Sequence, residues 1–311
     1  MVKVSVIIPN FNHAPFLKQR IDSILQQTFQ DFELIILDDC STDESRSIIE
    51  QYKNHPKVCT IIYNEKNSGS TFKQWQRGIQ IAKGDWIWIA ESDDYCDSTF
   101  LEELIRGVTS GDNVVLAYAQ TKCFNSNGTI WVSSHEHSEY LEGHLYVNKY
   151  MLNGNTISND SMVIFKKDIF NEIEKSYVDY RFCGDWLIWI SIIQKGNVYV
   201  CNKVLNYFRK HDKDVSSKAI VNGFEFTERI KILIFLKKIK SISEDKFVEL
   251  LINNYQYYLV HKRKIQKPIQ KAIENAFYFS DSNYGYKKIL LQNSKFLRLK
   301  NLIKLIVRKN E

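Results

Sequence analysis

Val4-Ser-Val-Ile-Ile-Pro-Asn-Phe-Asn12 combines a short β-branched apolar run, closed by Pro9, with polar residues directly behind it. A run of this kind predicts a buried strand. Residues 15–28 then place apolar side chains at helical spacing, so the first unit is strand, loop and helix. The unit recurs, because the pattern predicts further strands at 32–37, 58–63 and 86–90 and helices at 42–52 and 72–82. Fully apolar strands that alternate with helices indicate an α/β fold, with a mostly parallel sheet flanked by helices.

Beyond about residue 108, predicted strands and helices alternate less regularly. From about residue 218 it is rich in Lys and has helical periodicity. We therefore predict a domain over residues 1–215, with halves at about 1–95 and 96–215, and a basic α-helical C-terminal region over 216–311. Within residues 96–215, the pattern predicts helices at 97–108 and 186–194, strands at 161–165 and 198–208, and an antiparallel hairpin over 114–132.

Composition excludes several classes of protein. The chain has 311 residues, 44% of them hydrophobic, with only 12 Gly and 4 Pro, which excludes collagen-like, proline-rich and disordered chains. The net charge of +6 hides a split, because residues 1–200 carry 18 basic and 26 acidic side chains while residues 201–311 carry 24 and 10. The basic C-terminal part fits an anionic surface, either membrane phospholipid or nucleic acid. The acidic first part argues against binding nucleic acid along the whole chain.

Cysteines and apolar runs suggest a location. The six cysteines contain no C-x-x-C pair, so we expect reduced thiols rather than zinc ligands or disulfides. The N-terminal apolar run is too short for a signal peptide, and no stretch approaches the length of a membrane span. These features predict a cytoplasmic protein. Residues 294–309 resemble a basic amphipathic helix, which would lie on the inner face of the cell membrane or pack against its own domain or a second subunit.

Carboxylates gather where strands are predicted to end, which is where open α/β sheets bind ligands. Glu91, Asp93 and Asp94 follow one strand, and a cation such as Mg²⁺ or Mn²⁺ would offset their repulsion. The alternative is an exposed acidic turn before the next helix. Asp39 follows another strand and could accept a hydrogen bond from a nucleotide base while Phe11 stacks on it. Asp43, in the same loop, is better explained as a helix cap.

Five motifs in order carry a family resemblance. They are residues 4–12, quoted above, then Ile36-Leu-Asp-Asp-Cys-Ser-Thr-Asp43, Asn67-Ser-Gly69, Ala82-Lys-Gly-Asp85 and Glu91-Ser-Asp-Asp94. Together they resemble glycosyltransferase family 2, a group of inverting, metal-dependent nucleotide-sugar transferases with the GT-A fold. The resemblance covers about residues 3–212.

The resemblance implies roles for individual residues. Phe11 would stack on the base and Asp39 would read it, while Glu91, Asp93 and Asp94 occupy the D-x-D-type motif that meets ribose, diphosphate and metal. His211 would contact the diphosphate or help to hold the metal. The implied metal ligands are therefore Asp93, Asp94 and His211, for Mn²⁺ or Mg²⁺. The implied donor-binding residues also include Pro9 and a cation near the diphosphate, for which Lys73 and Arg77 both remain open.

The segment Arg181-Phe-Cys-Gly-Asp-Trp-Leu-Ile-Trp189 resembles the family's catalytic-base segment, in which Glu-Asp usually precedes an aromatic-rich helix. Gly184 replaces the usual Glu. Asp185 is the implied general base, and the alternative is an Asp that only complements a helix dipole. The implied reaction moves a sugar from a UDP or dTDP donor to a glycan or lipid-linked acceptor, as in the synthesis of cell-surface polysaccharide or lipopolysaccharide.

Other functions are weighed against this one. A catalytically silent nucleotide-sugar binding module of the same fold is the main alternative, and the acidic motif and Asp185 argue against it. A nucleotidyltransferase would show a Gly- and Lys/Arg-rich loop after the first strand, and the chain has none. A dinucleotide-dependent dehydrogenase is excluded because no G-x-G-x-x-G follows that strand. We expect no nucleic-acid partner.

Overall fold

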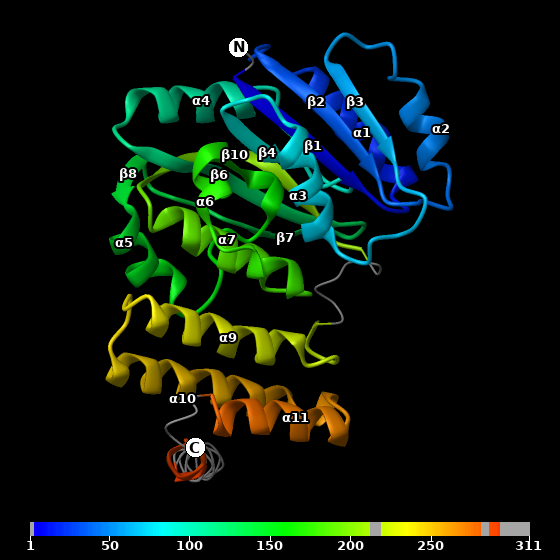
Figure 1. Ribbon diagram of the computed structural model, residues 1–311. Helices are drawn as coiled ribbons and strands as arrows, with labels where there is room; N and C mark the ends of the chain where they lie inside the picture. Colours follow the sequence, from blue (N-terminus) through cyan, green and yellow to red (C-terminus); the bar gives the residue numbers. More distant parts are fainter. Residues whose placement is uncertain (1–2, 212–218, 281–285, 293–311) are drawn as a thin grey trace, which may run out of the picture. The chain divides into compact units, whose positions relative to one another are not determined.

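The computed structural model describes residues 3–211, 219–280 and 286–292, and the chain divides into two compact units, Met1–Asp212 and Lys213–Glu311. The first unit is a mixed α/β structure, as predicted (Figure 1). Its strands are β1 (Val4–Asn10), β2 (Phe32–Asp38), β3 (Val58–Tyr63), β4 (Trp86–Ile89), β5 (Tyr95–Cys96), β6 (Val114–Asn125), β7 (Gly128–Val132), β8 (Glu139–Glu142), β9 (Val163–Lys166) and β10 (Asn197–Arg209). Its helices are α1 (Ala14–Leu25), α2 (Ser45–Glu50), α3 (Thr71–Ile81), α4 (Phe100–Ser110), α5 (Gly143–Tyr146), α6 (Lys167–Glu172) and α7 (Gly184–Ile193), with short turns η1 (Val147–Met151), η2 (Asp160–Met162) and η3 (Lys175–Asp179).

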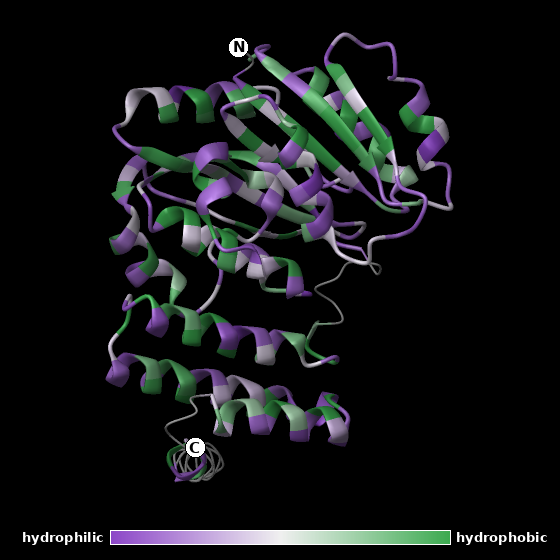
Figure 2. Cartoon of the chain, in the orientation of Figure 1, coloured by the Kyte–Doolittle hydropathy of each residue, from purple (hydrophilic) through white to green (hydrophobic). Residues whose placement is uncertain are grey.

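The described strands form one sheet in the order β3-β2-β1-β4-β9-β6-β10-β5, with β7 beside β6 and β8 beside β10. β3, β2, β1 and β4 are parallel, whereas β9 runs antiparallel to both of its neighbours, so the sheet is mixed. Every residue of β1 and β2 is buried, which is why these strands read as continuous apolar runs. Figure 2 shows the apolar residues concentrated on these strands. Because they are parallel, the carboxyl ends of β1, β2 and β4 meet at one edge.

The predicted hairpin is confirmed, since β6 pairs antiparallel with β7. The six cysteines, all within the described residues, form no disulfide. Four of them are buried, Cys40 is partly buried, and Cys59 is exposed on the edge strand β3. None of them lies in a group that suggests a metal site within the described residues.

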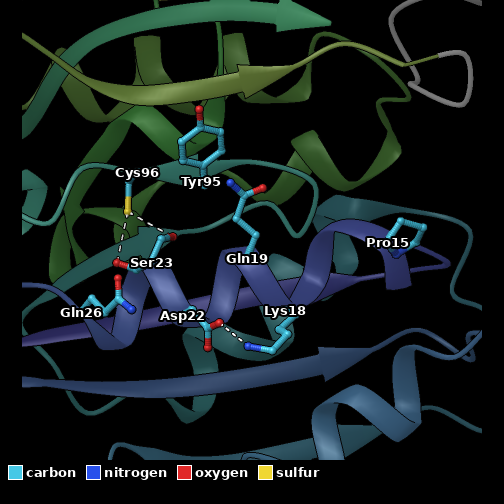
Figure 3. Close-up of a pocket in the computed structure, with 8 residues that line it drawn as sticks. All are labelled: Pro15, Lys18, Gln19, Asp22, Ser23, Gln26, Tyr95 and Cys96. Carbon is cyan, nitrogen blue, oxygen red and sulfur yellow. Dashed lines mark hydrogen bonds and ion pairs between the residues drawn. The ribbon is translucent and has the colours of Figure 1, made fainter. Parts of the chain in front are cut away.

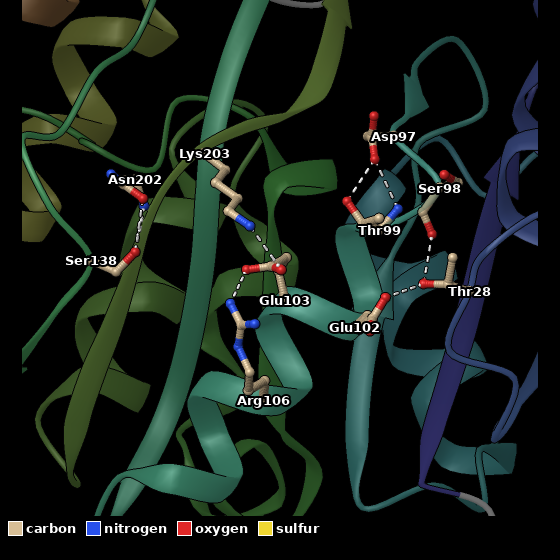
Figure 4. A network of polar contacts seen from close by, with 10 residues as sticks. All are labelled: Thr28, Asp97, Ser98, Thr99, Glu102, Glu103, Arg106, Ser138, Asn202 and Lys203. Carbon is tan, nitrogen blue, oxygen red and sulfur yellow. Dashed lines mark hydrogen bonds and ion pairs between the residues drawn. The ribbon is translucent and has the colours of Figure 1, made fainter.

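α4 is tied to the neighbouring elements by polar contacts (Figure 4). Glu103 pairs with Arg106 on its own helix and with Lys203 of β10, whose Nζ lies 2.9 Å from Glu103 Oε1. Thr28 Oγ1 donates to Glu102 at 2.6 Å, which joins the helix to the segment after α1. These contacts hold β10 against α4, and β10 ends at one residue of the site, Arg209, two residues before another, His211.

The second unit is helical, as predicted, with α9 (Phe224–Lys238), α10 (Glu244–His261), α11 (Lys267–Tyr278) and the short turn η4 (Lys262–Lys264). Its core consists of apolar and aromatic side chains from the three longer helices, including Phe226, Leu233, Phe247, Tyr258 and Phe277. Among the described helices, none is long and apolar enough to cross a bilayer. The amphipathic helix predicted over residues 294–309 lies outside the described residues.

Candidate functional site

The centre of the candidate site is the loop that follows β4, residues 91–94, which we call the acid loop. Asp93 lies there beside two imidazoles, His13 from the loop after β1 and His211 from just beyond β10. His211 Nε2 is 2.9 Å from Asp93 Oδ2. One ligand atom from each of the three residues lies within 4.8 Å of the others. The strand ends thus bring together a carboxylate and two imidazoles from three distant parts of the sequence.

Packing fixes the orientation of both imidazole rings. His211 stacks on Phe16 of α1, with ring centroids 5.3 Å apart, and meets His13 edge to face at 5.4 Å. His13 Nδ1 is 2.8 Å from the hydroxyl of Ser92 in the acid loop. A hydrogen bond to the other nitrogen is the usual way in which proteins orient a metal-binding imidazole. The rings are therefore positioned before any ligand arrives.

Asp93 is held in its charged form. Burial alone would raise the pKa of this carboxyl, but the hydrogen bond with His211 and the charges of His13 and His211 hold that pKa below its ordinary value. Arg209 Nε also donates to the Asp93 carbonyl oxygen at 2.9 Å. A carboxylate that stays ionised beside two nitrogen ligands is suited to a divalent cation.

Asp94, predicted as a metal ligand, is placed differently. It is 1% exposed, and its carboxylate accepts hydrogen bonds from Asn159 Nδ2, Ser161 Oγ and the Arg209 backbone N–H at 2.7–2.9 Å. Burial and then the neighbouring Asp93 raise the pKa of Asp94 to about 7. Its oxygens are committed to fixing η2 and β10 against the acid loop. Within the described residues, the ligand atoms that lie together are those of His13, Asp93 and His211, and Asp94, which we predicted as a ligand, is not among them.

Glu91 lies at the other end of the acid loop and faces α3. Its Oε1 accepts a hydrogen bond from Trp75 Nε1 at 3.0 Å, and Thr71 Oγ1 lies 3.5 Å away. Burial, followed by the charge of Asp93, raises the pKa of Glu91 to about 8. Glu91 is thus bonded to α3 and is absent from the group of metal-ligating atoms.

The protein itself supplies a positively charged side chain close to the acid loop. Arg20 of α1 is fully buried, and its guanidinium carbon lies 4.9 Å from the ring centroid of Trp88 in β4. Its charge lowers the pKa values of Glu91 and Asp94 against the effect of burial. Arg20 therefore offsets part of the repulsion among the carboxylates of the acid loop. From the sequence, we had expected a bound metal ion alone to offset that repulsion.

The predicted base-binding residues lie at the ends of β1 and β2. Phe11 is 44% exposed, so a face of its ring is accessible for stacking. Pro9 is buried inside β1 opposite Leu37, and this position leaves only its backbone for a ligand.

Asp39, predicted to read the base, is 5% exposed and its carboxylate is occupied by protein donors. It accepts hydrogen bonds from Asn64 Nδ2, from the backbone N–H and hydroxyl of Ser68, and from Gln74 Nε2 at 2.6–3.1 Å. A base edge would have to replace one of these donors. In this structure Asp39 therefore fixes the loop at residues 67–69 against α3.

The two cations considered for the diphosphate, Lys73 and Arg77, lie one turn apart on the exposed side of α3. Arg77 donates to Asn64 Oδ1. Within the described part of the chain, neither residue shares a hydrogen bond with the acid loop. Arg209 is closer to it, and its guanidinium also lies 4.7 Å from the ring centroids of Phe16 and Phe124.

Asp185 lies in the first turn of α7 (Gly184–Ile193) and is partly exposed. Its Oδ2 accepts a hydrogen bond from Asn155 Nδ2 at 2.7 Å, which fixes the orientation of the carboxylate. Gly184, where the family resemblance leads us to expect Glu, packs directly on the ring of Phe72. A Cβ at residue 184 would lie 2.6 Å from that ring. The ring occupies the space of the missing side chain, which explains this departure physically.

We expect Gly184→Ala to destabilise the first unit by about 1–3 kcal/mol, because Phe72 is buried and packed edge to face on Trp75 and cannot easily move. Thermal unfolding would measure the loss. In a Phe72→Ala background the same substitution should cost much less, since the clashing ring is gone. An equal cost in both backgrounds would disprove the proposed clash.

A pocket of about 530 Å³ lies along α1 beside β5 and is separate from the predicted site residues (Figure 3). Two of its charged side chains, Lys18 and Asp22, pair with each other at 2.6 Å. It adjoins the site through Gln19, whose Oε1 accepts from Arg209 Nη2 at 2.7 Å, and through Tyr95, whose ring centroid lies 5.9 Å from the Arg209 guanidinium carbon. The three residues with metal-ligating atoms, His13, Asp93 and His211, do not line this pocket.

Sequence reasoning missed several residues of the site. His13 follows the polar end of the first strand and could have been found there. Arg20 had a clear signal, because it lies with Leu17, Ile21 and Ile24 on the apolar face of α1. Asn155, Asn159 and Ser161 gave no local signal, since the carboxylates that they bind lie at least 30 residues away in the sequence.

The chain is similar to known glycosyltransferases in sequence and in fold. The family model described as Glycosyl transferase family 2 matches residues 5–174. The putative teichuronic acid biosynthesis glycosyltransferase TuaG of Bacillus subtilis is 26% identical over 241 residues, which cover 75% of this chain and 90% of TuaG.

Two solved structures share the fold. One is TarS 1–349 of Staphylococcus aureus in complex with UDP, with a TM-score of 0.67, 19% identity, and coverage of 89% of this chain and 80% of that one. The other is the mannosyltransferase PcManGT of Pyrobaculum calidifontis in complex with GDP-Man and Mn²⁺, with a TM-score of 0.58, 13% identity, and coverage of 96% and 87%. At these identities the likeness establishes the fold.

Proposed function

This chain belongs to glycosyl transferase family 2, and we propose that it is an inverting, Mn²⁺-dependent enzyme that transfers a sugar from a nucleoside diphosphate to a hydroxyl acceptor. The observation that carries the proposal is the placement of two acidic groups along one face of α3. Trp75 donates to Glu91 of the acid loop, and Phe72, three residues earlier on the same face, packs against Gly184, the residue before Asp185. One helix face therefore links the acid loop, at the diphosphate end of the site, to Asp185 at the acceptor end.

The residues present fit a divalent cation. His13, Asp93 and His211 offer two nitrogen ligands and one oxygen ligand within 4.8 Å of one another. Mg²⁺ prefers oxygen ligands, whereas imidazole suits softer metals, so this donor set favours Mn²⁺ of the two cations considered. When bound, the metal would neutralise charge on the departing diphosphate.

The protein groups account for the remaining chemistry. Asp185, oriented by Asn155, accepts the proton of the acceptor hydroxyl. The acceptor oxygen forms a bond to the anomeric carbon while the bond from that carbon to the diphosphate oxygen breaks, with the electron pair leaving on the diphosphate. Attack from the face opposite the leaving group inverts the anomeric centre. Phe11 offers its exposed ring to the nucleotide base.

The fold neighbours support a nucleotide-sugar donor, because TarS was solved with UDP and PcManGT with GDP-Man. The relationship to TuaG supports an acceptor in cell-surface polysaccharide synthesis. We propose a uridine or deoxythymidine diphosphate sugar as the donor and a glycan or lipid-linked acceptor. The excess of basic over acidic residues in the C-terminal part supports a cytoplasmic location at the membrane surface.

Thermal unfolding with a donor panel tests the proposal. UDP-glucose, UDP-N-acetylglucosamine, dTDP-glucose and GDP-mannose are each added with Mn²⁺ or with a chelator. At 100 times its Kd, the correct donor stabilises the fold by about 2.7 kcal/mol, which corresponds to a rise in Tm of roughly 5–10 °C. The rise should disappear in chelator. If no donor shifts Tm, the function is wrong, and if the shift survives chelation, the metal assignment is wrong.

Release of the nucleoside diphosphate from the best donor, with water as the acceptor, separates the enzyme from a silent binding module. An enzyme releases the nucleotide in a metal-dependent way, whereas a silent module binds the donor and leaves it intact. Binding without release, even when glycan acceptors are added, would favour the silent module.

A further inference from the structure

One carboxylate near the site has no role in the chemistry above. Asp160 begins η2, and its neighbours on both sides are bonded to the acid loop. Asn159 donates to Asp94 at 2.9 Å, and Ser161 donates to Asp94 at 2.7 Å while accepting from the backbone N–H of Glu91 at 3.0 Å. These bonds fix the backbone of Asp160 against the acid loop.

The Asp160 side chain itself is not satisfied. Its Oδ1 is buried and has no hydrogen-bond partner among the residues that the structure describes. An unpaired buried oxygen is costly because it has lost its water. The surrounding charges add to the cost, since Asp185 acts on Asp160 most strongly, followed by Glu91, Asp94 and Asp93 of the acid loop. Such a group is expected where a ligand supplies the missing hydrogen bond.

The bonds of its two neighbours locate Asp160 beside the acid loop. In the proposed function, Asp185 marks the acceptor end of the site and Asp93, in the acid loop, marks the diphosphate end. An in-line displacement places the donor sugar between these two ends. Asp160, held against the acid loop with a buried oxygen that lacks a partner among the described residues, is therefore a candidate to meet that sugar.

We propose that the Asp160 carboxyl group binds a hydroxyl of the donor sugar and thereby helps to select the sugar. This inference rests on the proposed function and extends it to the sugar-binding part of the site. The nucleotide alone lacks the sugar hydroxyl, so binding of UDP should be independent of Asp160.

Calorimetry on the full-length chain with Mn²⁺ tests the inference. The probes are UDP and whichever UDP-sugar gives the largest rise in Tm, and the variants are Asp160→Leu and Asp160→Asn. We expect the affinity for the UDP-sugar to fall roughly 10- to 100-fold in Asp160→Leu and by less in Asp160→Asn, which keeps a polar group. The affinity for UDP should not change. Asp168→Leu is the matched control, because Asp168 is exposed on α6, eight residues further on.

Stability gives a second readout. Removing an unpaired carboxyl from among like charges should raise the Tm of the ligand-free protein, while a residue with a purely structural role would lower Tm on substitution. Unchanged affinity of Asp160→Leu for the UDP-sugar would overturn the inference, as would an equal loss of UDP and UDP-sugar binding. If the wild-type chain binds UDP but no UDP-sugar, or binds neither, the proposed function fails first and this inference with it.

Discussion

Asp185→Asn should lower the rate of metal-dependent UDP release by about 10²- to 10⁴-fold, because an amide cannot take the proton of the attacking hydroxyl. Asn has nearly the same shape as Asp and can still accept the hydrogen bond from Asn155, so the fold and the start of α7 should persist. Single-turnover assays would measure the rate, and calorimetry with UDP and Mn²⁺ would show that nucleotide binding is intact.

The matched control is Asp179→Asn. Asp179 lies six residues before Asp185, in the exposed turn η3, and should be replaceable without effect. Wild-type turnover in Asp185→Asn would remove Asp185 from the mechanism. Loss of nucleotide binding in that variant would instead assign Asp185 a role in binding or folding.

The fold could be predicted from sequence because its signals are local. Apolar strands such as residues 4–8 and 32–37, separated by helical periodicity, determine the parallel part of the sheet without reference to distant residues. The antiparallel insertion of β9 between β4 and β6 has no such signal, since a strand's direction depends on pairing with partners far away in the chain. The sequence therefore predicted the strand at 161–165 but not its place in the sheet.

The candidate site was predicted less completely, and Asp93 and Asp94 show why. Both are acidic, adjacent and placed after the same strand, so no property of the sequence separates them. What separates them is Asn159, Ser161 and Arg209, which lie at least 65 residues away and bind Asp94 in the folded chain. A motif locates a group of carboxylates, whereas the partners that fold against it decide which one faces the ligand.

Substitution of these two neighbours should have opposite consequences. Asp93→Asn removes the charged ligand that lies between two imidazoles. Removing a residue that only hydrogen-bonds to a metal ligand lowers metal affinity by about 10- to 100-fold. Because Asp93 would bind the metal directly, we expect its loss to lower Mn²⁺ affinity by at least about 100-fold. Asp94→Asn places an amide N–H₂ against buried donors, so it should cost about 1–3 kcal/mol of stability through an unsatisfied group while weakening Mn²⁺ binding only modestly.

Calorimetric titration with Mn²⁺ and thermal unfolding of both variants distinguish these outcomes, and His13→Ala adds an independent check. If the ligand set is His13, Asp93 and His211, then His13→Ala should lose Mn²⁺ affinity together with Asp93→Asn, because the two residues come from different strand ends and both face the metal position. A metal held by Asp94 would reverse the pattern: Asp94→Asn would lose Mn²⁺ binding most, and His13→Ala would bind the ion as the wild-type chain does. The His13 variant matters most, since no acidic motif in the sequence includes that residue and only the folded chain brings it beside Asp93.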